Sequence, residues 1–264
     1  MMTKVRLDIL LVNKGLVESR SKAQALIMAG KVRVDDQVAT KAGMTVSLEA
    51  VVTIDDELPY VSRGGLKLEA ALDSFNIDPE AFICADVGAS TGGFTDILLQ
   101  RGAAKVYAID VGYGQLAWKL RQDKRVVVME RTNARHLNSL PEAIDLATID
   151  ASFISLKLIL PAVIKWLNSP ALVVALVKPQ FEAGRSQVGK GGVVRDPEVH
   201  HQVLLNIANY ALRLKFSISG LISSPITGPA GNHEFLLYLS WQVDQPPIDV
   251  DQTIERCLAG VKTV

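Results

Sequence analysis

The sequence predicts an α/β fold: an open, mostly parallel sheet of seven strands alternating with helices, preceded by a small α+β domain. Five near-continuously apolar runs recur between residues 82 and 179, as strands buried on both faces of a sheet require. The first 48 residues have a different pattern, with two short helical stripes followed by alternating strands. We therefore expect a small domain and linker over residues 1–60, the α/β domain over 61–243, and a helical C-terminal tail over 244–264.

The elements of the small domain follow from its periodicity and stop signals. An apolar helical stripe over residues 7–12 ends at Gly15, and a second helix over 21–30 is capped by Ser19 or Ser21 and ends at Gly30. Residues 31–43 alternate valines with polar residues around an Asp-Asp-Gln turn, which predicts paired strands.

The larger domain is expected to contain seven strands. They cover residues 82–88, 105–112, 125–131, 144–150, 171–179, 216–226 and 233–241. Helices are expected to begin near Gly93, Gly114 and Ser155, and at Pro197, which stands at a favoured first helical position. The last two strands have no helix between them, which indicates a terminal antiparallel pair.

Composition favours a protein of a reducing compartment. The two cysteines, Cys84 and Cys257, form no CxxC spacing, so we expect no disulfide framework and no metal site. The N-terminus lacks a secretory pattern, and the most apolar region, residues 158–177, is interrupted by lysine, asparagine and proline. We therefore expect a cytoplasmic protein without a membrane partner.

Basic charge is concentrated at the N-terminus. Residues 1–47 hold eight lysines and arginines against four acidic residues, a balance of +4 in a chain whose net charge is zero. A basic domain on an otherwise acidic protein indicates docking to a polyanion. The alternative is that these side chains only solvate a surface.

The run SRSKAQALIMAGKVRVD, residues 19–35, resembles the alpha-L RNA-binding domain. The resemblance covers roughly the first 48 residues and implies RNA binding through shape and phosphate charge. On this basis the candidate RNA-binding residues of the domain are Arg6, Arg20, Lys22, Lys31 and Arg33. The alternative is a dimerisation or packing module.

A glycine-rich turn follows the first strand of the larger domain. In CADVGASTGGFTDILLQ, residues 84–100, Gly88, Gly92 and Gly93 would let the backbone approach a ligand beyond the strand's carboxyl end. Ser90 occupies the second glycine position of the dinucleotide fingerprint, so that motif is absent. The run instead resembles the S-adenosylmethionine loop of FtsJ-like ribose methyltransferases, and a plain sharp turn is the alternative.

Two further strand ends support a cofactor site. Asp110 ends the second strand, where it could accept hydrogen bonds from a ribose diol, and Asn133 follows the third, where it could contact an adenine edge. The candidate cofactor residues are Asp86, Gly88, Ala89, Ser90, Gly92, Gly93, Asp110, Val111, Asn133 and Asp150.

Four ionisable residues stand at the ends of apolar elements, where an unpaired charge is costly. They are Lys67, Asp150, Lys178 and Glu234, and their order matches the catalytic tetrad of FtsJ-like ribose methyltransferases. A ribose hydroxyl must lose a proton to a positioned base. A second ammonium nearby and partial burial both favour a neutral amine. We therefore assign Lys178 as the base, Lys67 as its cationic and phosphate-orienting partner, and the carboxylates as positioning groups; the alternative is two structural salt bridges.

A glycine-rich basic loop lies between residues 179 and 197. Arg185 and Lys190 in this loop, with Arg63 near the start of the domain, are further candidates for contacts with RNA phosphates. A surface loop without such a role is the alternative. His200 and His201 have no ligand cluster near them in sequence and are expected on a helix surface.

Taken in series, VSRGGLKL, ADVGASTGGFTD, AIDVGYGQLAW, ERTNAR, IDASFISL, LVKPQFE, GKGGVVRDP and GPAGNHEF resemble the TlyA family over nearly the whole chain. The resemblance implies a class I, Rossmann-like methyltransferase sheet and 2′-O-methylation of cytidine in ribosomal RNA, with S-adenosylmethionine as cofactor and ribosomal RNA or ribosomal subunits as partners. One departure is the linker, where the family's Arg-x-Trp-Val is replaced by Leu58, Pro59, Tyr60 and Val61. The alternatives are a non-catalytic RNA-binding ribosome-assembly factor and a membrane-lytic hemolysin, a name that members often carry.

Overall fold

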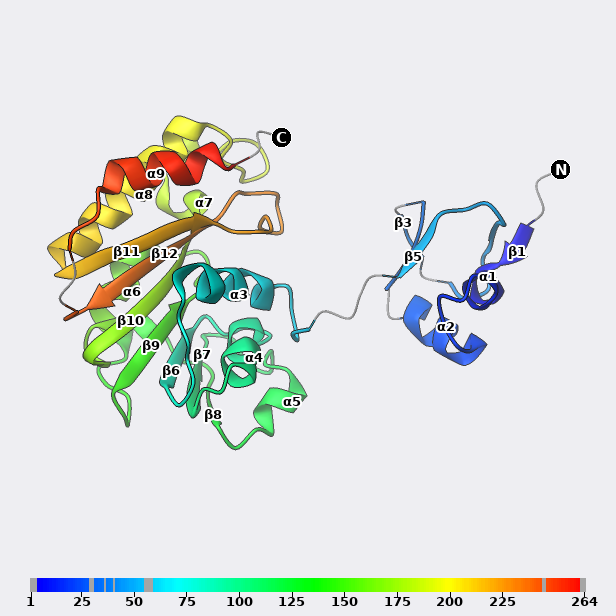
Figure 1. Cartoon of the computed structure of the whole chain (residues 1–264), viewed down its shortest axis with the longest axis horizontal. Helices are drawn as coiled ribbons and strands as arrows, with labels where there is room; N and C mark the ends of the chain where they lie inside the picture. The colour runs from blue at the N-terminus through cyan, green and yellow to red at the C-terminus, as the bar shows by residue number, and fades with distance from the viewer. Residues whose placement is uncertain are drawn as a thin grey trace. The chain divides into compact units, whose positions relative to one another are not determined.

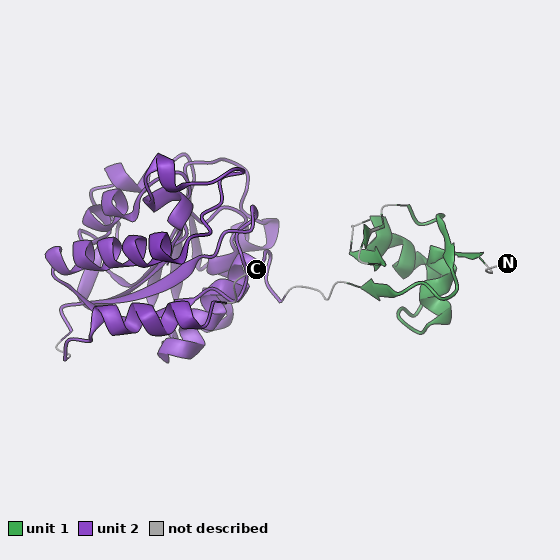
Figure 2. Cartoon of the chain, turned by 90° about the horizontal axis from the view of Figure 1, so that it is seen from above, with its two compact units in different colours: residues 1–58 green, residues 59–264 purple. Residues whose placement is uncertain are grey.

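The computed structural model describes residues 4–28, 31–35, 37–39, 41–54, 59–243 and 246–261. The chain divides into two compact units, Met1–Leu58 and Pro59–Val264, which Figure 2 colours separately. Within the described residues, no helix is long and apolar enough to cross a bilayer.

The N-terminal unit contains two helices and two small antiparallel sheets. Its elements are β1 (Lys4–Arg6), α1 (Leu7–Asn13), α2 (Arg20–Met28), β2 (Val32–Val34), β3 (Gln37–Val38), β4 (Thr45–Ser47) and β5 (Val52–Ile54). β1 pairs with β4, and β2 lies between β3 and β5. Ser19 Oγ accepts from Lys22 N, so Ser19 rather than Ser21 caps α2. Gly30, the expected end of that helix, lies outside the described residues.

A buried carboxylate organises the basic residues of this unit. Asp8 is fully buried and accepts two hydrogen bonds from Arg6 and one each from Arg20 and Gln24. The Arg6 guanidinium holds the pKa of Asp8 well below its usual value, against the opposing effect of burial. Both arginines stay about half exposed, at 45% and 54% of their side-chain surface, so Asp8 fixes two guanidinium groups that still face solvent.

The larger unit is built on a seven-stranded sheet with the order β11-β12-β10-β9-β6-β7-β8, seen in Figure 1. The strands are β6 (Ile83–Val87), β7 (Lys105–Ile109), β8 (Val126–Met129), β9 (Ile144–Ile149), β10 (Leu167–Val177), β11 (Phe216–Ser223) and β12 (Phe235–Trp241). β6 to β10 pair in parallel, whereas β12 runs antiparallel to both β10 and β11. The predicted sheet and its terminal antiparallel pair are confirmed.

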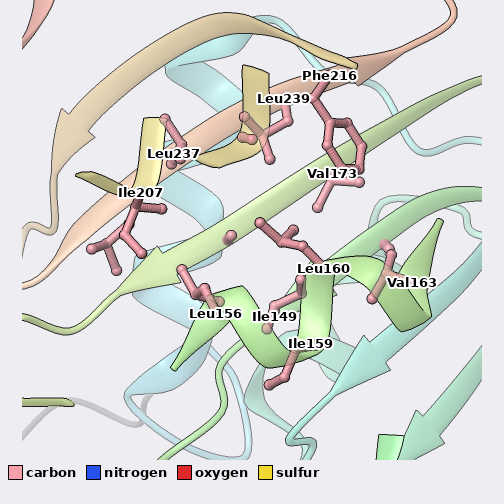
Figure 3. Close-up of a cluster of buried hydrophobic side chains, with 14 of the residues drawn as sticks. Ile149, Leu156, Ile159, Leu160, Val163, Val173, Ile207, Phe216, Leu237 and Leu239 are labelled. Atoms are coloured by element: carbon pink, nitrogen blue, oxygen red, sulfur yellow. The ribbon is translucent and has the colours of Figure 1, made fainter. Parts of the chain in front are cut away.

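Helices bury both faces of this sheet. They are α3 (Gly64–Phe75), α4 (Gly93–Gln100), α5 (Trp118–Arg121), η1 (Ala134–His136), α6 (Leu156–Val163), α7 (Pro179–Glu182), η2 (Arg185–Gln187), α8 (Pro197–Arg213) and α9 (Val250–Ala259). α6, α8 and α9 share one apolar core with alternate strand residues, part of which Figure 3 shows. α3, α4 and α5 share the other core with the intervening strand residues. Burial on both faces explains why the strands read as continuous apolar runs.

Two features of the helices were not expected, and the helical tail packs on the larger unit. α5 begins at Trp118 rather than near Gly114, because Gly114 has a φ of +74° and donates its N–H to Glu130 Oε1 at 2.8 Å. α3 was not predicted; no side chain caps its N-terminus, so the sequence carries no start signal there. The expected tail contains α9, whose Ile254 and Cys257 are buried in the core with α8, so it packs as part of the larger unit.

Candidate functional site

A cavity of about 440 Å³ opens at the carboxyl ends of β6, β7 and β9. It lies where ligands bind in open α/β sheets. Six of the ten candidate cofactor residues line it, namely Gly88, Ser90, Asp110, Val111, Asn133 and Asp150. Sequence reasoning missed Gln115, Thr132 and Phe153, which also line the cavity but stand outside any strand-end pattern.

The acidic residue after β7 shapes the wall of this cavity. Asp110 Oδ2 accepts from Ser90 N at 2.8 Å, and its Oδ1 accepts from Gly112 N at 2.7 Å. These bonds tie the glycine turn after β6 to the loop after β7. Asp110 remains only half-buried and keeps free lone pairs, so it can accept further hydrogen bonds from a ligand.

The other four candidate cofactor residues, Asp86, Ala89, Gly92 and Gly93, do not line the cavity. A Cβ atom on Gly92, whose φ is +101°, would overlap Leu120, and one on Gly93 would lie 2.8 Å from Gly65 N. Packing between α3, α4 and α5 therefore requires glycine at these two positions, whether or not a ligand also does.

Asp86 stabilises the glycine-rich turn through hydrogen bonds to Thr95 of α4. Its Oδ2 accepts from Thr95 N at 2.9 Å and from Thr95 Oγ1 at 2.7 Å, which satisfies one backbone N–H in the first turn of α4. The side chain is fully buried. Burial raises its pKa to about 7, against the lowering effect of the Thr95 hydrogen bonds.

This shifted pKa predicts a pH dependence of stability. Between about pH 4 and 7 the folded protein keeps a proton on Asp86 that the unfolded chain, with a carboxyl pKa of about 3.9, has released. The contribution of Asp86 to the free energy of unfolding should therefore fall as pH rises through this window, by up to about 1.4 kcal/mol per pH unit. Urea unfolding at several pH values should show the wild type losing stability relative to Asp86→Asn as pH rises. Parallel dependence of stability on pH in the two proteins would refute the raised pKa of Asp86.

The four candidate catalytic residues form two ion pairs. Lys178 Nζ lies 2.6 Å from Asp150 Oδ1 and donates to Ser152 Oγ at 2.8 Å. Lys67 Nζ donates to Glu234 Oε2 at 2.6 Å. All four side chains are at most 20% exposed, so both pairs are largely withdrawn from water.

Neighbouring elements bring the two pairs to one edge of the sheet. Asp150 directly follows β9, Lys178 directly follows β10, and Glu234 directly precedes β12, and these three strands are adjacent. Lys67 projects from α3, and Gln180 Nε2 donates to Glu234 Oε1 at 3.4 Å. Sequence reasoning missed Ser152 and Gln180, which follow Asp150 and Lys178 by two residues and carry no strand-end signal.

Asp150 connects the two parts of the site, since it lines the cavity and pairs with Lys178. A basic amine therefore stands beside a cavity at the carboxyl edge of the sheet. A second ammonium, that of Lys67 on α3, is held by Glu234 at the start of β12.

The candidate RNA-binding residues fall in both units. Lys22 is exposed, and Lys31 and Arg33 are half-buried, in the N-terminal unit. In the larger unit the exposed candidates are Arg63 just before α3, Arg185 on η2, and Lys190 in the loop before α8.

The described part of the linker is anchored on the larger unit. Tyr60 is buried, donates its hydroxyl hydrogen to Glu69 Oε1 at 2.6 Å, and packs so closely against Gly65 that no Cβ would fit there. Val61 N donates to Asp96 Oδ2 at 2.8 Å. Tyr60 thus keeps an aromatic contact at the altered linker motif, whereas Leu58 lies outside the described residues.

Two models of known families match the chain. The FtsJ-like methyltransferase model matches residues 60–241, and the S4 domain model matches residues 5–52. The first match covers most of the chain. This chain belongs to the FtsJ-like methyltransferase family. Its larger unit carries the FtsJ-like domain, and the expected small RNA-binding domain is confirmed as an S4 domain.

Relatives extend the similarity across both domains of this FtsJ-like protein. The 16S/23S rRNA (cytidine-2′-O)-methyltransferase TlyA of Mycobacterium tuberculosis is 50% identical, over 93% of each chain. Hemolysin A of Brachyspira hyodysenteriae is 43% identical, over 89% of this chain and 99% of the relative. A solved structure from Streptococcus thermophilus, named as a hemolysin, is 47% identical with a TM-score of 0.76, over 98% of this chain and 96% of that one. The TlyA resemblance is confirmed.

Proposed function

We propose that this protein transfers a methyl group from S-adenosylmethionine to the 2′-hydroxyl of a cytidine in ribosomal RNA. The observation that carries the proposal is the largely buried Lys178–Asp150 pair beside a cavity at the carboxyl edge of the sheet. The cytidine and the ribosomal RNA follow from the name of the M. tuberculosis relative. Such a substrate also favours action in the cytoplasm.

The cavity suits S-adenosylmethionine in size and in the chemistry of its lining. Asp110 and Asn133 offer oxygens to a ribose diol and an adenine edge, and Asp150 offers negative charge to a cationic ligand. The positive φ of Gly88, +85°, lets the turn after β6 bend along the cavity. When bound there, S-adenosylmethionine supplies an electrophilic methyl group on a positively charged sulfur.

The chain's own groups then serve alignment and proton transfer. Lys178 Nζ, in its neutral form, accepts the proton of the ribose 2′-hydroxyl as the bond from oxygen to the methyl carbon forms and the carbon–sulfur bond breaks. Asp150 and Ser152 hold the resulting ammonium in place. Lys67, fixed by Glu234, orients a backbone phosphate of the RNA.

The cofactor assignment predicts an effect on binding. Asp110→Ala should weaken S-adenosylmethionine binding by about 10–100-fold, because one or two charge-assisted hydrogen bonds are lost. Isothermal titration of the full chain measures this. Asp123→Ala is the matched control, since Asp123 pairs with Arg125 and does not line the cavity. An equal loss in both variants would argue against Asp110 as a ligand residue.

The N-terminal S4 domain would supply affinity for RNA through Arg6, Arg20, Lys22, Lys31 and Arg33, with Arg63, Arg185 and Lys190 adding phosphate contacts on the larger unit. Binding of this kind weakens steeply with salt.

Transfer of labelled methyl to ribosomal RNA from a strain lacking the gene tests the proposed function. We expect label on a cytidine 2′-oxygen, located by primer extension at limiting nucleotide concentration. RNA binding without transfer would instead indicate a non-catalytic assembly factor, and label on a base would refute ribose methylation.

A further inference from the structure

A second cavity, of about 460 Å³, lies in the larger unit between the loop before α8, the loop before β12 and the end of α9. In the described part of the chain the two cavities share no lining residue, and the proposed reaction does not use the second cavity. Val194, Pro197 and Leu258 contribute apolar walls, whereas Arg195, His200 and His233 contribute polar groups. A mixed lining of this kind suits a ligand with a flat apolar face and an anionic group.

Buried polar bonds hold the walls of this cavity in place. Asn232, which is 2% exposed, accepts from Val194 N at 3.0 Å and donates to Gly192 O at 2.9 Å, so it joins the two loops. His200 is 3% exposed rather than on the helix surface, which corrects the expectation from sequence. Its Nε2 lies 3.1 Å from Val194 O, a carbonyl that can only accept.

The polar groups define what the cavity can bind. Because Val194 O fixes the hydrogen of His200 on Nε2, Nδ1 of the neutral ring is an acceptor, which suits an exocyclic amino group of a base. Burial, the largest effect, lowers the pKa of His200 and so favours this neutral ring. Arg195 is exposed and forms no ion pair among the residues that the structure describes, so its guanidinium is available to a phosphate.

Residues that line this cavity are close in sequence to the proposed catalytic residues. His233 lines it and directly precedes Glu234, the partner of Lys67. Its other loop, which carries Lys190 and Arg195, is the basic glycine-rich segment that follows Lys178 and α7. The loop before β12 therefore contributes one residue to this cavity and the next residue to the pair with Lys67.

We propose that this cavity binds a second nucleotide of the substrate RNA, one that flanks the methylated residue, with its base against the apolar wall and its phosphate on Arg195. The inference rests on the proposed function and identifies how the same site selects its RNA. Stacking and phosphate contacts are the usual means by which proteins bind unpaired nucleotides.

Methyl-labelled valine and leucine in the full chain provide a direct test. With S-adenosylmethionine in excess to fill the first cavity, cytidine 5′-monophosphate should shift the methyl resonances of Val193, Val194 and Leu258. Inorganic phosphate at the same concentration should shift them far less. Thr227→Trp, a change at an exposed position of the lining, should abolish the nucleotide shifts. Equal shifts with phosphate alone would show an anion site only, and shifts confined to Val87 and Val111 of the first cavity would overturn the proposal.

Kinetics with RNA provide the second readout. Arg195→Gln should raise KM for RNA about tenfold, the effect of losing about 1.4 kcal/mol of binding, with kcat within about twofold of wild type. Arg213→Gln is the matched control, because Arg213 is an exposed arginine at the opposite end of α8. Unchanged KM with normal methyl transfer would refute this inference and leave the proposed function standing. Absence of methyl transfer by the wild type would refute the proposed function, while the resonance shifts would still report on the cavity.

Discussion

Replacing Lys178 with alanine is expected to lower the rate of methyl transfer by about 10²–10⁴-fold, the usual contribution of positioned proton transfer. Lys178 is the only one of the four candidate catalytic residues that both pairs with a cavity-lining carboxylate and carries an amine able to take a proton. The loss should appear in kcat, whereas the Kd for RNA should stay near the wild-type value because its binding groups lie elsewhere. Single-turnover transfer and filter binding measure the two quantities.

Two further variants separate proton transfer from charge. Lys178→Arg keeps the positive charge beside Asp150, yet a guanidinium does not give up its proton in proteins, so activity should stay as low as in the alanine variant. Lys165→Ala is the matched control, since this exposed lysine precedes β10 and Lys178 follows it. Near-normal activity of Lys178→Arg would show that charge, rather than a proton acceptor, is what the reaction needs.

The central strands of the larger domain were predictable because they are buried on both faces, and continuous apolar runs between glycine-rich turns are typical of such strands. The same reasoning placed Asp110, Asp150 and Lys178 correctly at one edge, since parallel strands share the direction of their carboxyl ends. Position along a strand therefore predicted where the cavity lies, and the start of the antiparallel β12 brings Glu234 to the same edge.

Partners across the fold were not predictable. That Lys67 pairs with Glu234 depends on how α3 lies against β12, and that Lys178 pairs with Asp150 depends on β9 and β10 being neighbours, and no local pattern encodes either arrangement. His200 was misplaced because an imidazole in a helix reads as polar, whereas a carbonyl from the preceding loop satisfies it in the core. The packing of Gly92 against Leu120 was also not predictable, because a glycine required by packing and one required by a ligand look alike in sequence.

Gly88 provides the strongest test of how the backbone builds the site. Its φ of +85° is one that L-residues rarely adopt, and a Cβ there would lie 2.6 Å from Asp150 O and 2.9 Å from Asp150 C. The obstruction is backbone, and β6 pairs with β9 immediately before it, so neither side can move without disturbing the sheet. Gly88→Ala should therefore destabilise the protein by about 2–5 kcal/mol, through the left-handed backbone and overpacking together.

Gly114→Ala is the matched control for this effect. Gly114 also has a positive φ, +74°, but nothing lies within 4 Å of where its Cβ would be, so only the backbone cost of about 1–2 kcal/mol should appear. Urea unfolding measures both variants. The new methyl group of Gly88→Ala can be accommodated only if Asp150 moves, and Asp150 holds Lys178. Methyl transfer by folded Gly88→Ala should therefore also fall well below that of Gly114→Ala. Equal stability and equal activity in the two variants would show that the turn does not position the Lys178–Asp150 pair.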